Sequence, residues 1–292
     1  MKKIVALALL LLTACQGSNH SEETVPAGQE AAVVGGYTVV SNGVLKTKVL
    51  SLGVAVKNVD GGLSASQCTA SALTSRLIIT AAHCISANAV HTQVELRDNN
   101  NKIVPFKAEK AFVHAGYAKD KQNDLALLLL EKPLPAGIRK LSLPYQWSVL
   151  LFDQILAAGY GKDNGVQGEK YTLGVLRVTN IPVLEFDKTK KTFVVDQRKG
   201  HGICQGDSGG PAMVTKDGID YIVGVVSKTV YQLPETIDGV PDFCNYKGVY
   251  VNIQQGELRK WIIDTSNQAM LTNAVNPALA VTYDYTAVNA QE

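Results

Sequence analysis

Residues 204–211 read CQGDSGGP and place one serine, Ser208, among closely spaced glycines. Small neighbours let backbone N–H groups crowd around whatever the Ser208 hydroxyl attacks, which is the requirement for an oxyanion hole. A serine hydroxyl is a weak nucleophile unless a neighbouring base removes its proton. The motif therefore predicts a nucleophile, and the base and an orienting acid must be sought elsewhere in the chain.

The same residues also fit the G-x-S-x-G turn of α/β-hydrolases. In that turn a helix follows the serine, and the catalytic histidine comes last in the chain. Here no histidine follows Ser208, and Pro211 opens a β-branched, glycine-containing stretch that disfavours a helix. The α/β-hydrolase interpretation is therefore excluded.

The base must then be a histidine that precedes the serine. Residues 80–84 read TAAHC and follow the apolar run 77–79, so His83 is expected at a strand end, where Cys84 could pin it. A histidine satisfied within the core is the alternative interpretation. Its cysteine neighbour and the Ser208 motif together favour His83 as the base.

The orienting acid should be a buried carboxylate. Asp124 stands at the start of the apolar run 125–130, where an unpaired carboxylate would be costly. It therefore needs a partner, such as the ring N–H of His83. An Asp–His–Ser order would instead require Asp60, but the turn 60–62, DGG, explains that residue better.

Composition and charge exclude several other classes of protein. The chain has 292 residues, 46% of them hydrophobic and 18% charged, which excludes wholesale disorder. A net charge of +2 lacks the basic excess of a nucleic-acid-binding protein. No apolar run reaches the roughly 18 residues of a membrane span. The phosphate-loop, HExxH and CxxC motifs do not occur, so no cofactor or metal is predicted.

The N-terminus is typical of an exported protein. Two lysines at positions 2–3 precede the apolar run 4–12, as in a signal peptide, with a buried helix as the alternative. Ordinary cleavage after position 14 would need a small residue at position 12, which is a leucine. Residues 12–15, LTAC, instead resemble the lipobox of bacterial lipoproteins, in which the cysteine, here Cys15, is acylated and becomes the new N-terminus.

Acylation of Cys15 would use the odd one of five cysteines and leave four for two disulfides. A cysteine that carries two or more acyl chains is a lasting membrane anchor. Because Gln16 follows it, the lipoprotein rule implies sorting to the outer membrane of a cell with two membranes. Residues 1–14 are then a signal peptide, and residues 15–32 a polar lipid-anchored tether or propeptide.

From residue 33 the chain shows short apolar or alternating runs broken by Gly, Asn, Asp and Pro. This pattern is typical of an antiparallel all-β barrel or sandwich. One helix is predicted from residue 255 to about 265, where Leu258, Trp261 and Ile262 share a face. Residues 267–292 form a tail without an assignment. The expected strands include residues 49–56, 77–80, 125–130, 156–158, 173–178, 221–226 and 248–252.

Three motifs together resemble those of the trypsin/chymotrypsin-type serine peptidases. In chain order they are TAAHC at 80–84, NDLALLLL at 123–130 and GDSGGP at 206–211. The resemblance implies two antiparallel six-stranded β-barrels, residues 33–145 and 146–266, with a closing C-terminal helix. Shorter matches extend it over about residues 33–266: VVGG at 33–36, AGYG at 158–161, GVY at 248–250 and WI at 261–262.

The resemblance also implies a role for each motif residue. Ser208 is expected to be the nucleophile, and His83 to take its proton and return it to the leaving amine. Asp124 is expected to fix the imidazole tautomer and stabilise the imidazolium. The backbone N–H groups of Gly206 and Ser208 are expected to form the oxyanion hole.

Two disulfides follow from the same resemblance. Cys68 is expected to pair with Cys84 beside the histidine, and Cys204 with Cys244 beside the specificity pocket. Both suit an oxidising compartment. Other bridges common in animal members are absent from the sequence.

The resemblance further implies activation by cleavage. A freed amine at Val33 is expected to pair with Asp207 and so shape the oxyanion hole. A buried charge at Asp207 without its partner would cost several kcal/mol. The chain is therefore expected to be an inactive zymogen until it is cut after Ala32, which would also separate it from its lipid anchor. The alternative is that Val33 begins a strand in an intact chain.

The specificity pocket is expected to be non-tryptic. Gly202 takes the floor position at which trypsin-like members need an aspartate. Thr229 replaces a wall glycine and narrows the entrance, so small or medium apolar side chains are favoured, with chymotrypsin-like cleavage second. Lys228 replaces the family's usual tryptophan. The expected substrate-binding residues are Gly202, Ile203, Ser227, Thr229 and Gly248.

The sequence thus predicts an exported, monomeric serine endopeptidase that acts on proteins or peptides through an acyl-enzyme. Two alternatives stay open. A non-catalytic binding protein on the same scaffold usually loses a triad residue, and this chain keeps all three. A small-molecule esterase would use the same machinery.

Overall fold

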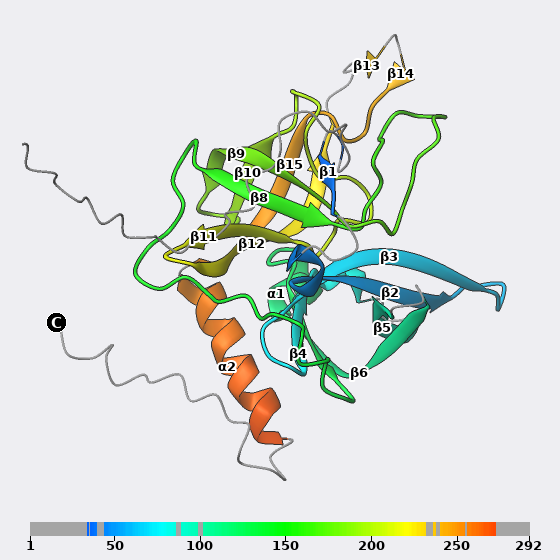
Figure 1. Ribbon diagram of the computed structural model, residues 1–292, viewed down its shortest axis with the longest axis vertical. Coiled ribbons are helices and arrows are strands. Elements are labelled where there is room, and N and C mark those ends of the chain that lie inside the picture. The colour runs from blue at the N-terminus through cyan, green and yellow to red at the C-terminus, as the bar shows by residue number, and fades with distance from the viewer. Residues whose placement is uncertain are drawn as a thin grey trace, which may run out of the picture.

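The computed structural model confirms the predicted fold class, with two closed six-stranded antiparallel β-barrels and a C-terminal helix (Figure 1). No helix within the described part of the chain is long and apolar enough to cross a bilayer. The structure describes residues 34, 36–39, 44–85, 89–98, 102–231, 236–237, 240–254 and 256–272.

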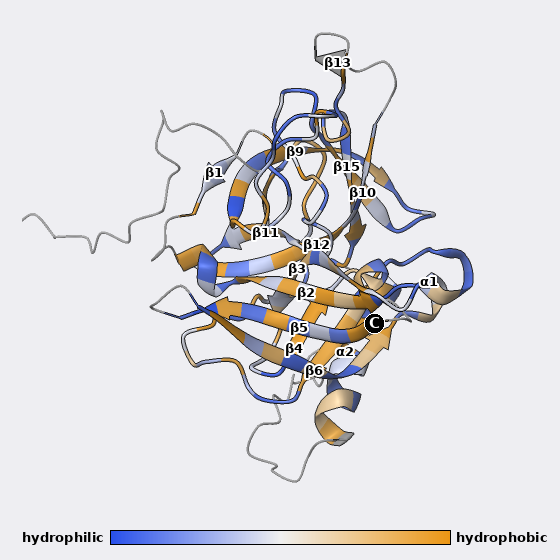
Figure 2. Cartoon of the chain, turned by 90° about the vertical axis from the view of Figure 1, so that its right-hand side faces the viewer, coloured by the Kyte–Doolittle hydropathy of each residue, from blue (hydrophilic) through white to orange (hydrophobic). Residues whose placement is uncertain are grey.

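The first barrel is formed by consecutive strands joined in the order β2-β3-β4-β7-β6-β5. Its core contains large apolar side chains, among them Leu50, Leu52, Ile78 and Leu128. Figure 2 shows the long hydrophobic stretches along these strands. Their bounds are β2 Val49–Lys57, β3 Leu63–Ala72, β4 Leu77–Thr80, β5 Ala89–Arg97, β6 Ile103–Val113 and β7 Ala126–Leu130.

Short helices complete this half of the molecule. The 3₁₀ helix η1, Val44–Thr47, precedes β2, and the 3₁₀ helix η2, Ala82–Cys84, follows β4 directly. The α-helix α1, Ala115–Asp120, lies between β6 and β7, where no helix was predicted. The backbone N–H group of His83 in η2 donates to Asp124, and that of His114, which caps the start of α1, donates to the Leu125 carbonyl, so three chain segments meet just before β7.

The second barrel has the strand order β8-β9-β10-β15-β12-β11 and closes through pairing of β11 with β8. Phe193 and Tyr250 stack in its core with ring centroids 5.1 Å apart. The barrel strands are β8 Gln154–Gly159, β9 Arg177–Asp187, β10 Thr192–Asp196, β11 Pro211–Lys216, β12 Ile219–Val230 and β15 Lys247–Asn252; β1 Tyr37–Thr38 pairs with β9, and β13 Thr236–Ile237 with β14 Val240–Pro241.

A third apolar cluster joins the two barrels. It combines Leu77 and Leu127 of the first barrel with Met213 of the second. The C-terminal helix α2, Gly256–Thr272, inserts Leu258 and Ile262 into the same cluster. One continuous core therefore holds the two barrels against each other.

Two expected boundaries are wrong. Helix α2 continues to Thr272 instead of ending near residue 265, because Ala269 is fully buried against the core. The expected strand 173–178 is irregular over its first residues, since β9 begins only at Arg177. Leu173 and Val175 are exposed there, so their apolar character does not reflect a core strand.

Candidate active site

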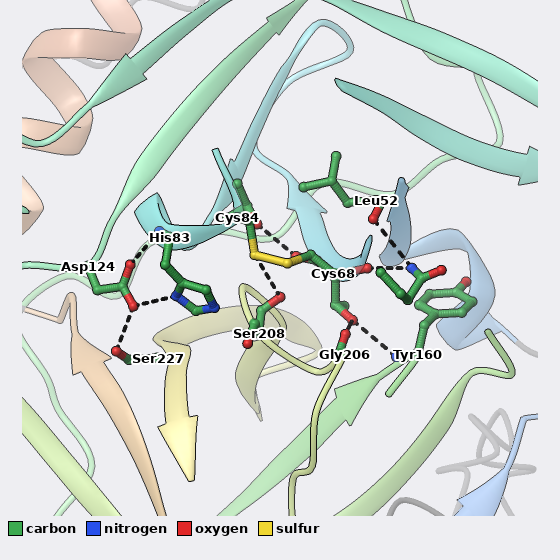
Figure 3. Close-up of a disulfide and its surroundings, with 12 residues drawn as sticks. Leu52, Cys68, His83, Cys84, Asp124, Tyr160, Gly206, Ser208 and Ser227 are labelled. Atoms are coloured by element: carbon green, nitrogen blue, oxygen red, sulfur yellow. Dashed lines mark hydrogen bonds and ion pairs between the residues drawn. A yellow bond between two sulfur atoms is a disulfide. The ribbon is translucent and has the colours of Figure 1, made fainter. Parts of the chain in front are cut away.

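His83 is held at the end of the first barrel by its neighbours in the chain. The buried strand β4 leads into η2, which presents the His83 ring with one third of the side chain exposed. The disulfide between Cys68 and Cys84 ties η2 to β3, which confirms the predicted pairing (Figure 3). The imidazole therefore projects from a segment fixed on both sides.

Asp124 faces His83 and accepts three hydrogen bonds. Its Oδ2 lies 2.7 Å from Nδ1 of His83, and its Oδ1 lies 2.9 Å from the backbone nitrogen of His83. The Ser227 hydroxyl donates to Oδ2 at 2.7 Å (Figure 3). Only 6% of Asp124 is exposed. The predicted contact between His83 and Asp124 is thus formed, and Ser227 donates a third hydrogen bond to the Asp124 carboxylate.

These contacts keep Asp124 ionised despite its burial. Burial alone would raise the pKa of Asp124, but the hydrogen bonds and charge of His83 and the bond from Ser227 together hold that pKa below its usual value. An ionised Asp124 accepts the Nδ1 proton of His83. Nε2 of His83 then carries the lone pair, as a general base requires.

The loop 204–211 is anchored by its own aspartate. One Asp207 oxygen accepts from the backbone nitrogen of Gly161 at 2.7 Å, and the other from that of Cys204 at 2.8 Å. The predicted disulfide between Cys204 and Cys244 is also confirmed. These bonds hold the loop against the end of β8 and against the segment that precedes β15.

The Asp207 carboxylate is buried without an ion pair to any described residue. It is 1% exposed, and burial raises its pKa to about 6, against the opposing effect of the two backbone bonds and the Arg177 charge. Arg177 itself donates to the Gly161 carbonyl at 3.2 Å and pairs with Asp163. The Asp207 carboxylate therefore has no cation in direct contact among the described residues.

Two backbone donors near Ser208 are free of protein partners. Within the described residues, neither the Gly206 nor the Ser208 N–H group donates to another group. The Gln205 carbonyl accepts a hydrogen bond from the Lys162 backbone nitrogen at 2.9 Å. Because the carbonyl and N–H groups of a trans peptide point in opposite directions, the Gly206 N–H group points away from Lys162. Gly206 has φ of +100°, a conformation that glycine adopts readily. Both predicted oxyanion-hole donors are thus available.

Thr69, which the sequence analysis missed, fixes this loop from the other barrel. Its hydroxyl donates to the Gly206 carbonyl at 3.0 Å and accepts from the Tyr160 nitrogen at 3.1 Å. Its backbone nitrogen donates to the Ser208 carbonyl at 2.8 Å. Thr69 lies in the buried second half of β3. No motif signals this role, since threonine is common in strands.

A cavity of about 420 Å³ between the two barrels gathers most of the predicted site. The Ser208 hydroxyl and the His83 ring share it without a hydrogen bond between them, a looseness usual in unliganded sites. Gly202 and Gly248 are buried and do not line it. The predicted catalytic and substrate-binding residues that line the cavity are His83, Asp124, Ile203, Ser208, Ser227 and Thr229, together with the disulfide residue Cys204.

Comparison with known proteins agrees with this geometry. A family model described as trypsin matches residues 20–262. The chain belongs to the trypsin family. Trypsin-4 of Rattus norvegicus is 28% identical over 222 residues, which cover 70% of this chain and 81% of that protein.

Two larger proteins match the trypsin-family region over a smaller share of their length. Ovochymase of Halocynthia roretzi is 28% identical over 236 residues, or 71% of this chain and 14% of that protein. The proclotting enzyme of Tachypleus tridentatus is 28% identical over 206 residues, or 57% of this chain and 52% of that protein. The chain therefore spans only part of these two relatives.

Some predictions for this trypsin-family chain fall outside the described residues. They are the signal peptide, the acylated Cys15, and cleavage between Ala32 and Val33. The nearest described residue is Val34, whose carbonyl accepts from the Gly202 nitrogen at 2.8 Å. These predictions stay predictions.

Proposed function

We propose that this chain is a serine endopeptidase that hydrolyses peptide bonds through an acyl-enzyme. The observation that carries the proposal is the hydrogen-bonded Asp124–His83 pair, which shares one cavity with Ser208. The first barrel supplies His83 and Asp124, and the second supplies Ser208, so the three side chains can act together only in the cavity between the barrels. The trypsin family supplies the same reaction class.

Each group has a defined task in the reaction. Nε2 of His83 takes the Ser208 proton while the serine oxygen bonds to the substrate carbonyl carbon. The Gly206 and Ser208 N–H groups stabilise the resulting oxyanion, each contributing about 10²–10³ in rate. His83 then gives its proton to the leaving amine as the C–N bond breaks. Water then attacks the acyl carbon while His83 takes its proton. His83 returns this proton to the Ser208 oxygen as the ester bond breaks, which releases the acid product and restores the hydroxyl.

The edge of β12 favours a peptide over a small ester as the substrate. Strand β12 has a bulge at Ser227, and residues 228–230 that follow it pair with β15 on one side. On the other side the described chain places no strand, since β11 pairs with β12 only up to Val225. A free strand edge beside the nucleophile can bind an extended peptide by main-chain hydrogen bonds.

Activation by cleavage before Val33 is part of the proposal. A free amine at Val33 would supply the cation that the buried Asp207 carboxylate lacks among the described residues. The contact between Val34 and Gly202 is consistent with the start of the mature chain running past the loop 204–211. N-terminal sequencing of active enzyme tests this, and an active form that begins well before Val33 would contradict it.

The remaining proposals concern location and specificity. We propose export with a lipid on Cys15, which the lipobox-like residues 12–15 support, and release of a monomeric enzyme on activation. Two disulfides fit an oxidising compartment. The absence of an acid at Gly202 supports cleavage after small or medium apolar residues, while basic residues lack a charge partner.

A peptide-library digestion compares the activated chain with its Ser208→Ala variant. We expect the wild type to cut peptides after small or medium apolar residues, and the variant, folded by circular dichroism, to leave all of them intact. Hydrolysis of activated esters without any peptide cleavage would favour the esterase. Absence of both activities would favour a binding protein.

A further inference from the structure

The Gln197 side chain is a fully buried polar group in the second barrel. Gln197 directly follows β10 and has an exposed fraction of 0%. Its Nε2 donates to the Ile203 carbonyl at 3.0 Å and to the Cys244 carbonyl at 2.6 Å. Its Oε1 accepts from the Ile203 nitrogen at 3.1 Å. Both amide hydrogens are used, so the side chain is fixed in one position.

Two glycines show where this amide lies. A Cβ atom built on Gly202 would overlap the end of the Gln197 side chain, and one built on Gly248 would overlap its Oε1. The side-chain directions of Gly202 and Gly248 therefore both point at Gln197. The amide fills the space between these two residues, which is why neither position can carry a side chain.

The active-site cavity ends before it reaches this space. Its lining includes Ile203 and the edge residues 226–229, whereas Gly202, Gly248 and Gln197 do not line it. Ile203, which lines the cavity, is bonded to Gln197 at both backbone groups, so the amide lies directly behind this part of the lining. The expected floor at Gly202 thus lies behind Gln197.

We propose that Gln197 is a specificity-determining residue that closes the floor of the pocket for the side chain preceding the cleaved bond. The proposal rests on the proposed peptidase function. A shallow pocket closed in this way accepts alanine, valine or similarly small side chains and excludes phenylalanine. The buried amide is neutral and has no free hydrogen to offer, so it offers neither charge nor a donor to a deeper substrate group.

A graded substrate series tests the proposal. The activated chain is assayed on peptides that differ only in having Ala, Val, Leu or Phe before the cleaved bond. For the wild type we expect kcat/KM to be highest with Ala or Val. In Gln197→Ala we expect the ratio of kcat/KM for Phe to that for Ala to rise at least tenfold, because the vacated volume admits a larger side chain.

Gln254→Ala is the matched control. Gln254 is 2% exposed, belongs to the same barrel and binds the Val149 nitrogen through its side-chain oxygen at 2.6 Å, but it does not line the cavity. Gln254→Ala should lower the melting temperature and leave the ratio for Phe to Ala unchanged. If Gln197→Ala does not fold, Gln197→Asn keeps the amide, shortens the side chain, and should raise the ratio for Leu to Ala.

The outcomes separate this proposal from the proposed function. Cleavage by the wild type with the same profile in the folded Gln197 variants would overturn the role of Gln197 alone. A wild-type preference for Phe would do the same. Failure of the wild type to cut any peptide of the series, together with failure to react with a serine-directed phosphonate, would overturn both.

Discussion

At the scale of single residues, the buried charge of Asp207 links the fold to activation. The carboxylate orders the loop 204–211 through bonds to Gly161 and Cys204, yet it lies in an environment that favours its neutral form. The same residue therefore orders the loop that carries the proposed oxyanion hole, and its burial destabilises the folded chain while no cation binds it. An activating amine would relieve this penalty.

The pH dependence of stability measures this penalty. Because folding raises the pKa of Asp207 from 3.8 to about 6, the folded chain holds a proton that the unfolded chain releases between these values. The contribution of Asp207 to the free energy of unfolding is therefore present below pH 4 and is lost as the pH rises to about 6, by about 3 kcal/mol. Asp207→Asn removes this loss.

Urea denaturation between pH 4 and pH 7 tests the prediction in uncleaved Ser208→Ala protein. With rising pH, the unfolding free energy of Asp207→Asn should gain about 2 kcal/mol relative to its parent over this range. A difference that does not change with pH would contradict the account. In protein cut before Val33, the free amine of Val33 should stabilise the Asp207 carboxylate, so Asp207→Asn should no longer gain unfolding free energy over its parent as the pH rises.

Residues inside short motifs could be predicted from the sequence, and residues outside them could not. His83 and Asp124 each follow or precede an apolar run and meet as expected. Thr69 and Gln197 have no such signal, because their roles depend on contacts with residues far away in the chain. Only the folded backbone brings these partners together.

At the scale of elements, β3 braces the catalytic loop across the gap between the barrels. Thr69 at the inner end of β3 joins the Gly206 carbonyl to the Tyr160 nitrogen, just after β8. Strand β3 of the first barrel thereby fixes the peptide between Gly206 and Asp207, which directly follows the proposed oxyanion-hole donor of Gly206. We infer that Thr69 is a positioning residue.

Thr69→Val tests this role with a side chain of the same shape. Loss of the hydroxyl leaves two buried backbone groups unpaired, at about 1–3 kcal/mol each. We expect kcat to fall at least tenfold with little change in KM, since the oxyanion hole acts mainly on the transition state. Thr69→Ser should restore most of kcat. Equal losses in Thr69→Ser and Thr69→Val would show that the hydroxyl is not the cause.

Apolar strands were predicted better than strands of small or half-exposed residues. The run at β4 matches its prediction, because all four of its residues are buried. β3 and β6 are not among the strands named from the sequence, since β3 is rich in Ser and Ala and most of β6 is exposed. The strand pattern alone also left the choice between barrel and sandwich open; the two barrels came from the motifs.

At the scale of the whole molecule, the proposed catalysis would depend on the alignment of the two barrels. His83 and Asp124 belong to the first barrel and Ser208 to the second. The apolar cluster between the barrels, with Ile262 of α2 fully buried in it, fixes their relative position. Loss of packing there should reduce both stability and activity.

Ile262→Ala probes this interface, and Leu271→Ala on the same helix is its control. Deleting the buried Ile262 side chain should lower the free energy of unfolding by about 2–5 kcal/mol within a single transition. Leu271 is 74% exposed, so Leu271→Ala should change it by less than about 0.5 kcal/mol. Two separate transitions in urea for the wild-type protein would contradict a shared core.

The central claim is that Asp124 and His83 activate Ser208 in one cavity. The most direct measurement is mass spectrometry of the activated chain after treatment with a serine-directed phosphonate. We expect one adduct, located on Ser208 by peptide mapping, formed at a rate that falls at least 10²-fold in folded His83→Ala. An adduct on another residue, or equal labelling of Ser208 in the wild type and in His83→Ala, would contradict it.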